Sequence, residues 1–267
     1  MADRPIITLL TDFGWGDGYI GAMKGVILDI NPDCRIVDLA HHIPPHDVMG
    51  GALVLGQTYT FFPAGTIHVA VVDPGVGGAR RPLILEAGDY LFVGPDNGIF
   101  TFVLKQEQDA QAYELIEERF RLPCVSRTFH GRDIFAPAAA HLSREIPPAE
   151  MGPVVDYTEL TTLAIPEPVL EGETLVGEVI WVDSFGNLVT NISQERLGEF
   201  AAGGIVELEI KGERIRGLKT AYEEGQEGEV IALWGGAGFL EISLKGASLH
   251  GARGWGRGEP VRIRRGR

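Results

Sequence analysis

Cysteine is scarce in this chain of 267 residues, which holds only Cys34 and Cys124. Two cysteines without a paired spacing argue against a disulfide framework and a zinc knuckle, and they fit a reducing cytoplasm. No apolar segment is long enough for a signal-peptide core or a membrane span. Basic residues are also few, since 23 Lys and Arg against 37 Asp and Glu give a formal net charge of -14. This charge disfavours nucleic acid or an anionic membrane as a partner.

The first 152 residues alternate short apolar segments with segments of helical periodicity. A β-α-β-α-β succession of this kind predicts an α/β domain with a mostly parallel sheet. The expected elements are 6–10, 19–30, 36–39, 48–61 and 67–72, then a hairpin of 83–86 and 90–93 and a helix over 134–142.

The second half has a different texture. Prolines and acidic residues with little periodicity predict a linker over 153–173. Beyond it, short β-rich segments punctuated by glycine predict an all-β domain over 174–267, a small antiparallel barrel or sandwich. The expected strands are 178–182, 188–192, 205–210, 230–233, 239–244 and 261–263.

The most informative loop follows the strand expected at 67–72, where Asp73 is followed by Pro-Gly-Val-Gly-Gly-Ala and then Arg80. Glycine costs conformational entropy, so this density of it indicates a backbone that approaches something closely. Ligands bind at the carboxyl ends of strands in open α/β sheets. The loop lacks the ending of a phosphate loop, and Arg80 stands in place of the last glycine of a dinucleotide fingerprint. An Asp facing an Arg across a tight loop therefore needs a different explanation.

Two aspartates follow the first expected strand, in Thr-Asp12-Phe-Gly-Trp-Gly-Asp17-Gly. A carboxylate at this position can accept both hydroxyls of a ribose, as in nucleotide-binding α/β folds. Aspartate is also a good N-cap, so Asp12 or Asp17 could simply begin the following helix. Position alone leaves both interpretations open.

A histidine and a glycine precede the alanine-rich helix expected over 134–142, in Phe-His130-Gly131-Arg-Asp133. A histidine held at the sheet edge can exchange protons near neutral pH, although a single histidine is more often structural. Asp133 could be the N-cap of the helix.

Three histidines and two aspartates lie within ten residues, in Asp38-Leu-Ala-His41-His42-Ile-Pro-Pro-His46-Asp47. Such a cluster suggests a metal site. However, no two histidines are spaced four apart on a helix, and the Pro-Pro pair forces an extended kink. Turn and cap residues are the favoured interpretation, with Asp47 as an N-cap and His46 able to line a pocket.

Two glycine-containing segments of the second half each allow two interpretations. Asp183-Ser-Phe185-Gly-Asn187 could be a hairpin turn, or a polar rim with an aromatic ring suited to an amine and a nucleobase. Trp234-Gly-Gly-Ala-Gly-Phe239 could be a bulge, or could present bare backbone N–H groups to a carboxylate.

Together these segments resemble one family, the S-adenosyl-L-methionine (SAM) hydroxide adenosyltransferases, relatives of the fluorinating and chlorinating SAM enzymes. The motifs that carry the resemblance are Thr-Asp12-Phe-Gly, Val-Val-Asp73-Pro-Gly-Val-Gly, Gly-Pro-Asp96-Asn97-Gly98, Phe-His130-Gly-Arg-Asp and Asp183-Ser-Phe-Gly-Asn187. They cover nearly the whole chain, in order and at compatible spacings. Five ordered motifs make a strong signal where any one of them would be weak.

The resemblance implies hydrolysis of SAM to adenosine and L-methionine, with no cofactor and no metal. It also implies a two-domain subunit and a homotrimer whose sites lie between the N-terminal domain of one subunit and the C-terminal domain of the next. Asp73, Arg80 and His130 would activate the water. The substrate-binding positions would be Asp12 and Asp17 at the ribose, Gly131 beside the histidine, Asp183 at the methionine ammonium, Asn187 and Phe185 at the adenine, and Tyr222 as the second adenine-stacking ring.

The chain departs from the halogenating relatives at the water-activating positions. Those enzymes carry a hydroxyl-bearing aromatic in place of Asp73 and a Tyr-Ser pair in place of His130-Gly131, and an anionic Asp73 repels a halide. The fluorinating enzymes also have a longer excursion where this chain has only residues 87–89. Three rival functions stay open: a halide-using SAM enzyme, a non-catalytic SAM or adenosine sensor, and a metal-dependent hydrolase built on His41, His42 and His46.

Overall fold

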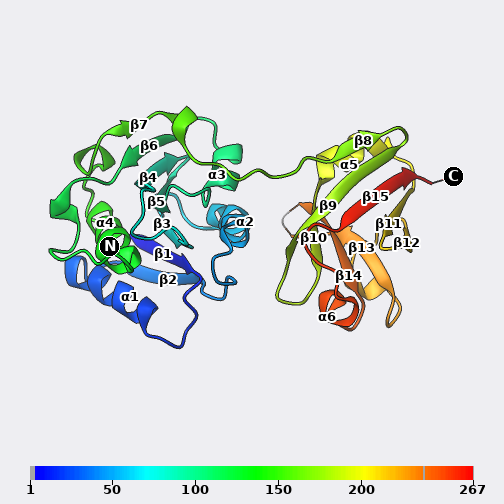
Figure 1. Cartoon of the computed structure of the whole chain (residues 1–267), viewed down its shortest axis with the longest axis horizontal. Coiled ribbons are helices and arrows are strands. Elements are labelled where there is room, and N and C mark those ends of the chain that lie inside the picture. Colours follow the sequence, from blue (N-terminus) through cyan, green and yellow to red (C-terminus); the bar gives the residue numbers. More distant parts are fainter. Residues whose placement is uncertain (1–3, 237, 267) are drawn as a thin grey trace. The chain divides into compact units, whose positions relative to one another are not determined.

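The computed structural model describes residues 4–236 and 238–266 (Figure 1). The chain divides into two compact units, Met1–Leu163 and Ala164–Arg267. This division falls inside the stretch 153–173 that the sequence predicts as a linker. Part of that stretch is ordered into short elements, because β7 (Val154–Val155) pairs with the sheet of the first unit and β8 (Val169–Glu171) with that of the second.

The first unit is built on a mixed sheet of strand order β2-β1-β3-β5-β4-β6-β7. Its strands are β1 (Ile6–Thr11), β2 (Arg35–Ala40), β3 (Ile67–Val71), β4 (Pro82–Ala87), β5 (Tyr90–Pro95), β6 (Gln111–Glu114) and β7. The strands β2, β1, β3 and β5 pair in parallel, whereas the predicted β4–β5 hairpin, β6 and β7 pair antiparallel. The α/β prediction is confirmed, and the sheet is parallel in part.

Helices cover both faces of this sheet (Figure 1). They are α1 (Tyr19–Ile30), α2 (Val48–Thr58), α3 (Thr101–Gln106) and α4 (Ala136–Leu142). Helices α1 and α4 pack into one apolar cluster with β1 and β3, and α2 and α3 pack into the other. Helix α1 buries Ile20, Met23 and Ile27, whose spacing places them on one helical face. The cap predicted at Asp47 is confirmed, because its side chain accepts a hydrogen bond from the Gly50 N–H at 3.0 Å.

The second unit is a nearly closed antiparallel barrel, as predicted, with strand order β12-β11-β15-β9-β10-β14-β13 and β8 paired with β9. Its remaining strands are β9 (Thr174–Val182), β10 (Leu188–Ser193), β11 (Val206–Ile210), β12 (Glu213–Arg216), β13 (Val230–Trp234), β14 (Phe239–Leu244) and β15 (Pro260–Arg265). Short helices α5 (Gln194–Ala201) and α6 (Leu249–Arg253) follow β10 and β14. Strand β15, which contains the strand expected at 261–263, buries Val261 and Ile263 in the barrel core and exposes Arg262 and Arg264 on its other face.

None of the helices in residues 4–236 and 238–266 has the length and apolar character that a bilayer span requires.

Candidate active site

The loop after β3 folds back so that Arg80 meets Asp73. The Arg80 Nε donates to both carboxylate oxygens of Asp73 at 3.1 Å, and its Nη2 also donates to Asp73. Two turns bend the backbone between them, since the Val76 N–H donates to the Asp73 carbonyl and the Gly78 N–H to the Gly75 carbonyl. Both charged side chains are withdrawn from solvent, with 10% of Arg80 and 4% of Asp73 exposed. The predicted Asp–Arg pair is therefore formed.

His130 joins this pair through Arg80. The Nη2 of Arg80 lies 2.7 Å from Nδ1 of His130. An arginine nitrogen only donates, so Nδ1 accepts and the neutral imidazole carries its proton on Nε2. Burial, followed by the charge of Arg80, lowers the pKa of His130, which favours the neutral ring. The structure thus brings His130 to the Asp73–Arg80 pair, although 50 residues separate it from Arg80 in the sequence.

A widened helical turn presents His130. Residues Gly131–Phe135 form a π-helical turn ahead of α4, with His130 at its N-cap position. The prediction that Asp133 caps this helix is wrong: its buried carboxylate accepts from the Ser126 N–H at 2.8 Å and from Arg132 Nε at 2.6 Å. Burial raises the pKa of Asp133, but these donors outweigh it and leave the pKa below its ordinary value. Asp133 therefore stays charged and ties the preceding loop to the turn.

The backbone of Gly131 packs closely against the side chains of Phe13, Met23 and Phe129. A Cβ there would lie 3.3 Å from the Met23 sulfur and 3.4 Å from the rings of Phe129 and Phe13. A larger residue would push the His130 turn away from α1.

Asp12 emerges at the same sheet edge as Asp73. Strands β1 and β3 are neighbours with Thr11 opposite Val71, and parallel strands end at one edge. The Asp12 carboxylate accepts from the His46 N–H at 2.8 Å. The capping interpretation is wrong for Asp12 and Asp17, because Gly18 is the N-cap of α1 and no side chain caps it. Asp17 lies exposed in the same loop.

The histidines of the 38–47 segment do not converge. His41 is buried and uses both ring nitrogens, Nδ1 with the Thr11 hydroxyl at 2.8 Å and Nε2 with Asp38 at 2.9 Å. His42 is exposed, and His46 has a left-handed φ of 68°. Within the described residues, no three His, Cys, Asp or Glu side chains are grouped as metal ligands.

In the second unit, Asp183 organises the β9–β10 turn. One of its oxygens accepts from the Phe185 N–H at 2.9 Å and the Asn187 N–H at 2.8 Å, and the other accepts from Asn187 Nδ2 at 3.0 Å. The hairpin interpretation is confirmed, and the same turn leaves Phe185 77% exposed. Tyr222, on the loop before β13, donates to the buried Glu241 at 2.5 Å. Burial, followed by this bond, raises the pKa of Tyr222.

Sequence reasoning missed Glu241, which also accepts from the Ser243 hydroxyl at 2.9 Å. A charged residue between apolar neighbours in a strand was the available signal. The Trp234–Phe239 segment is a tight turn, in which the Gly235 N–H donates to the Phe239 carbonyl, and Ala237 lies outside the described residues.

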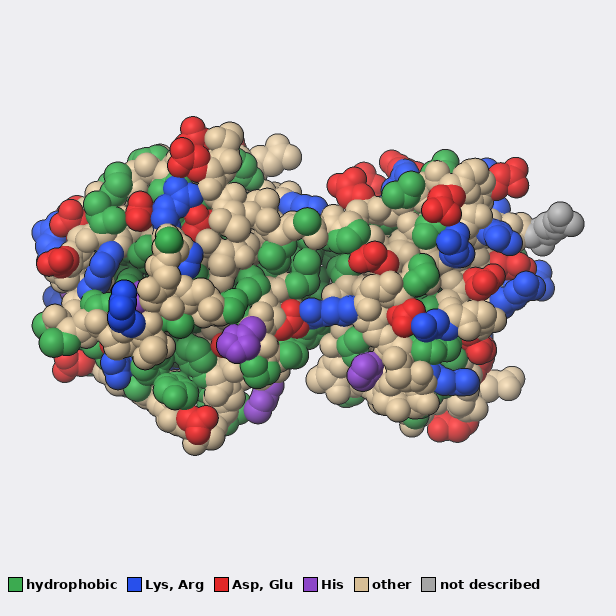
Figure 2. Space-filling view, in the orientation of Figure 1, with side chains coloured by type: hydrophobic (Ala, Val, Ile, Leu, Met, Phe, Trp, Pro, Cys, Tyr) green, Lys and Arg blue, Asp and Glu red, His purple; other side chains and the backbone are tan. Residues whose placement is uncertain are grey.

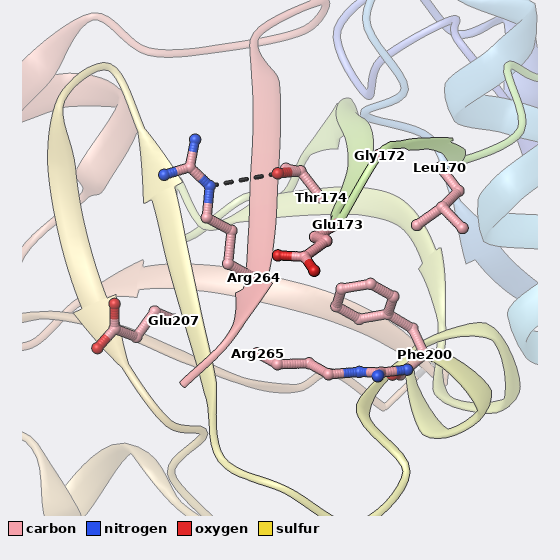
Figure 3. A pocket seen from close by; sticks show the side chains of 8 residues that line it. All are labelled: Leu170, Gly172, Glu173, Thr174, Phe200, Glu207, Arg264 and Arg265. Carbon is pink, nitrogen blue, oxygen red and sulfur yellow. Dashed lines mark hydrogen bonds between the residues drawn. The ribbon is translucent and has the colours of Figure 1, made fainter. Parts of the chain in front are cut away.

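A cavity of about 870 Å³ lies at the other end of β9 (Figure 3). The residues that line it include Leu170 and Phe200 and side chains of both charges, namely Glu173, Glu207, Arg264 and Arg265. Figure 2 shows acidic and basic side chains intermixed on the visible face of this unit. The cavity and the Asp183 turn lie at opposite ends of β9. The nine residues of this strand span about 30 Å at a rise of ~3.3 Å per residue. The cavity contains none of the predicted site residues.

Family models match both units: the SAM hydroxide adenosyltransferase N-terminal domain over residues 7–152 and its C-terminal domain over residues 177–262. The chain belongs to the SAM hydroxide adenosyltransferase family. A relative named (R)-S-adenosyl-L-methionine hydrolase from Thermus thermophilus is 38% identical and covers 97% of this chain and 99% of its own. A fluorinase from an Actinoplanes species is 28% identical and covers 92% of this chain and 93% of its own.

Among solved structures, an uncharacterized conserved protein from Thermotoga maritima superposes with a TM-score of 0.89 at 32% identity, covering 97% of this chain and all of its own. The chain therefore shares the fold of this crystal structure as well as the sequence motifs of the family.

Proposed function

We propose that this SAM hydroxide adenosyltransferase hydrolyses (R)-S-adenosyl-L-methionine to adenosine and L-methionine. The single observation that carries the proposal is Arg80, which holds Asp73 and His130 in one cluster at the edge of the sheet. The name of the Thermus thermophilus relative, (R)-S-adenosyl-L-methionine hydrolase, supports the substrate and its (R) configuration.

The reaction needs a better nucleophile rather than a better leaving group. Water attacks the ribose C5′ carbon, the C5′–O bond forms, and the C5′–S bond breaks with its electrons passing to sulfur. The sulfonium leaves as a neutral thioether, so its departure is favourable. Water is weak and has to be held in line and deprotonated.

Asp73 is the group that we assign as the proton acceptor. The Nδ1 of His130 is occupied by Arg80, and its Nε2 already carries the proton. His130 therefore donates a hydrogen bond that orients the water, and a free lone pair of the Asp73 carboxylate takes the proton. Arg80 fixes both side chains and favours the developing hydroxide.

The binding roles follow the motifs. Asp12 accepts the ribose hydroxyls with Asp17 nearby, and Gly131 lets the substrate approach the His130 turn. In the barrel unit, Asp183 takes the methionine ammonium. The adenine would contact Asn187, Phe185 and Tyr222. The implied homotrimer remains a prediction that light scattering of the purified protein checks.

Product analysis tests the proposal. Purified protein is incubated with each sulfonium epimer of SAM, with and without chloride and with EDTA, and the products are separated by chromatography. We expect adenosine and methionine from the (R) epimer under all three conditions, and far less of both from Arg80→Met. Absence of adenosine, despite adenosine binding by calorimetry, would leave a non-catalytic binding protein. Loss of activity in EDTA would instead favour a metal-dependent hydrolase.

A further inference from the structure

The Gly-Pro-Asp96-Asn97-Gly98 motif has no part in the chemistry above, yet it contacts both ends of the Asp73–Arg80 loop. The sheet order explains how: β5 lies between β3 and β4, so the loop that leaves β3 and enters β4 has to pass over the end of β5. Asp96 and Asn97 are the two residues that follow β5.

Asn97 holds the start of the loop. Its Nδ2 donates to the carbonyl of Val72 at 2.8 Å, one residue before Asp73. Its Oδ1 accepts from the Ile99 N–H at 3.2 Å, so both ends of the amide are engaged. The bond from Ile99 fixes the orientation of the Asn97 amide, and the bond to the Val72 carbonyl then holds the end of the strand.

Asp96 holds the end of the loop. Its buried carboxylate accepts from Arg81 Nε at 3.0 Å and Nη2 at 2.8 Å, and its N–H donates to the Arg81 carbonyl at 2.9 Å. Arg81 follows Arg80 directly. The other Asp96 oxygen accepts from the Thr161 N–H at 2.8 Å, which fastens the same carboxylate to the last segment of the unit.

We propose that Asp96 and Asn97 form a clasp that sets the separation of Asp73 and Arg80 and so positions the water-activating cluster. This inference rests on the proposed function. One trans peptide unit joins Asp96 to Asn97 and fixes the separation of their Cα atoms, so the two anchors stay close together. The loop between the anchors is rich in glycine and is closed internally by its two turns and by the Arg80–Asp73 pair, so the placement of its ends decides where that pair lies. Asp96 and Asn97 are positioning residues, because neither contacts Asp73 or His130 by hydrogen bond.

Asn97→Ala tests the clasp against an effect on folding alone. Misplacing reacting groups by about 1 Å costs roughly 100-fold in rate. We therefore expect kcat for SAM hydrolysis to fall by about 10- to 100-fold, while the Kd for adenosine stays within about twofold, because the binding residues remain in place. Asp96→Asn is the second variant, and it replaces Asn97→Ala if that protein does not fold. It keeps the size of the Asp96 side chain but removes the charge that faces Arg81.

Asn31→Ala is the matched control. Asn31 is a buried asparagine of the same unit whose Nδ2 donates to the Ser143 hydroxyl at 2.7 Å, with no contact to the loop. We expect it to lower Tm while leaving kcat unchanged. Equal kcat in the Asn97→Ala and Asn31→Ala proteins would overturn the clasp.

Hydrogen exchange gives a readout that needs no turnover. The amides of Val76 and Gly78 close the two turns of the loop. We expect them to exchange at least about tenfold faster in Asn97→Ala than in wild type, and not in Asn31→Ala. If wild type fails to hydrolyse SAM, the proposed function fails, whereas unchanged exchange in Asn97→Ala overturns the clasp itself.

Discussion

His68 should make the stability of this protein depend strongly on pH. His68 is the second residue of β3, and its side chain is fully buried. Its ring stacks on Phe92 at 5.2 Å, and Tyr59, Phe62 and Tyr90 also pack around it. Nδ1 bonds to the Thr8 hydroxyl at 2.8 Å, while Nε2 has no partner among the described residues. A charged imidazolium in this apolar surrounding would be strongly disfavoured.

Burial lowers the pKa of His68 to about 4 from an ordinary value of 6.5. Between these two values the unfolded chain binds a proton at this position and the folded chain does not, so stability rises with pH in that window. One pKa unit corresponds to about 1.4 kcal/mol, and a shift of this size therefore amounts to about 3 kcal/mol. The contribution is complete above the unfolded pKa and is lost as the pH falls from about 7 to about 4.

Urea unfolding of wild type and His68→Gln at several pH values from 7 to 4 measures the pH-dependent contribution of His68 to the free energy of unfolding. Glutamine removes the titration and keeps a polar group near Thr8. We expect the free energy of unfolding of wild type to fall by about 3 kcal/mol more than that of the variant across this range. His42→Gln is the control, because His42 is exposed, and it should follow wild type. Parallel curves for wild type and His68→Gln would refute the inference that His68 stays neutral in the folded protein.

Three further outcomes follow from the site and its surroundings. Arg80→Met should lower kcat by about 100- to 1000-fold, because it removes the group that holds the cluster, and steady-state kinetics would expose an error if kcat stayed unchanged. Gly77→Ala should distort the loop and lower both Tm and kcat, because φ is 73° there and a Cβ would overlap the Arg127 carbonyl. Asp47→Ala should cost about 1 kcal/mol in urea unfolding through loss of the α2 cap but leave turnover intact, and a turnover loss would contradict this separation.

Local patterns were enough to predict the elements that build the site. The buried β-branched run of β3, the hairpin of β4 and β5, and the cap at Asp47 each depend on neighbours in sequence, and all three are confirmed. Glycine density and the carboxyl-end rule pointed to the Asp73–Arg80 loop for the same reason. The strands β6, β7, β8 and β12 were missed. Strands β6 and β12 are short and polar, and β7 and β8 are short strands inside the stretch predicted as a linker.

Partners far apart in sequence were beyond the reach of those patterns. Asp133 looked like a helix cap, but it holds the Ser126 loop, and the π-helical turn that carries it has no signature of its own. The Asp96-Asn97 pair entered only as a family motif. Its contacts with Val72 and Arg81 depend on β5 lying between β3 and β4, which a linear sequence does not display.

The charge of the cluster bears on the choice between water and halide. Asp73 contributes one negative charge, Arg80 one positive charge, and His130 is neutral when its Nδ1 accepts from Arg80. The sum is zero, so no uncompensated positive charge is left to hold an anion. Taken alone, the Asp73 carboxylate would repel a halide about 4 Å away by about 4 kcal/mol at an effective dielectric of about 20, a repulsion that Arg80 reduces according to its own distance from the halide. Neutral water carries no such penalty. Chloride should therefore neither yield a chlorinated nucleoside nor compete with hydrolysis, and a chlorinated product at millimolar chloride would refute this exclusion of halide.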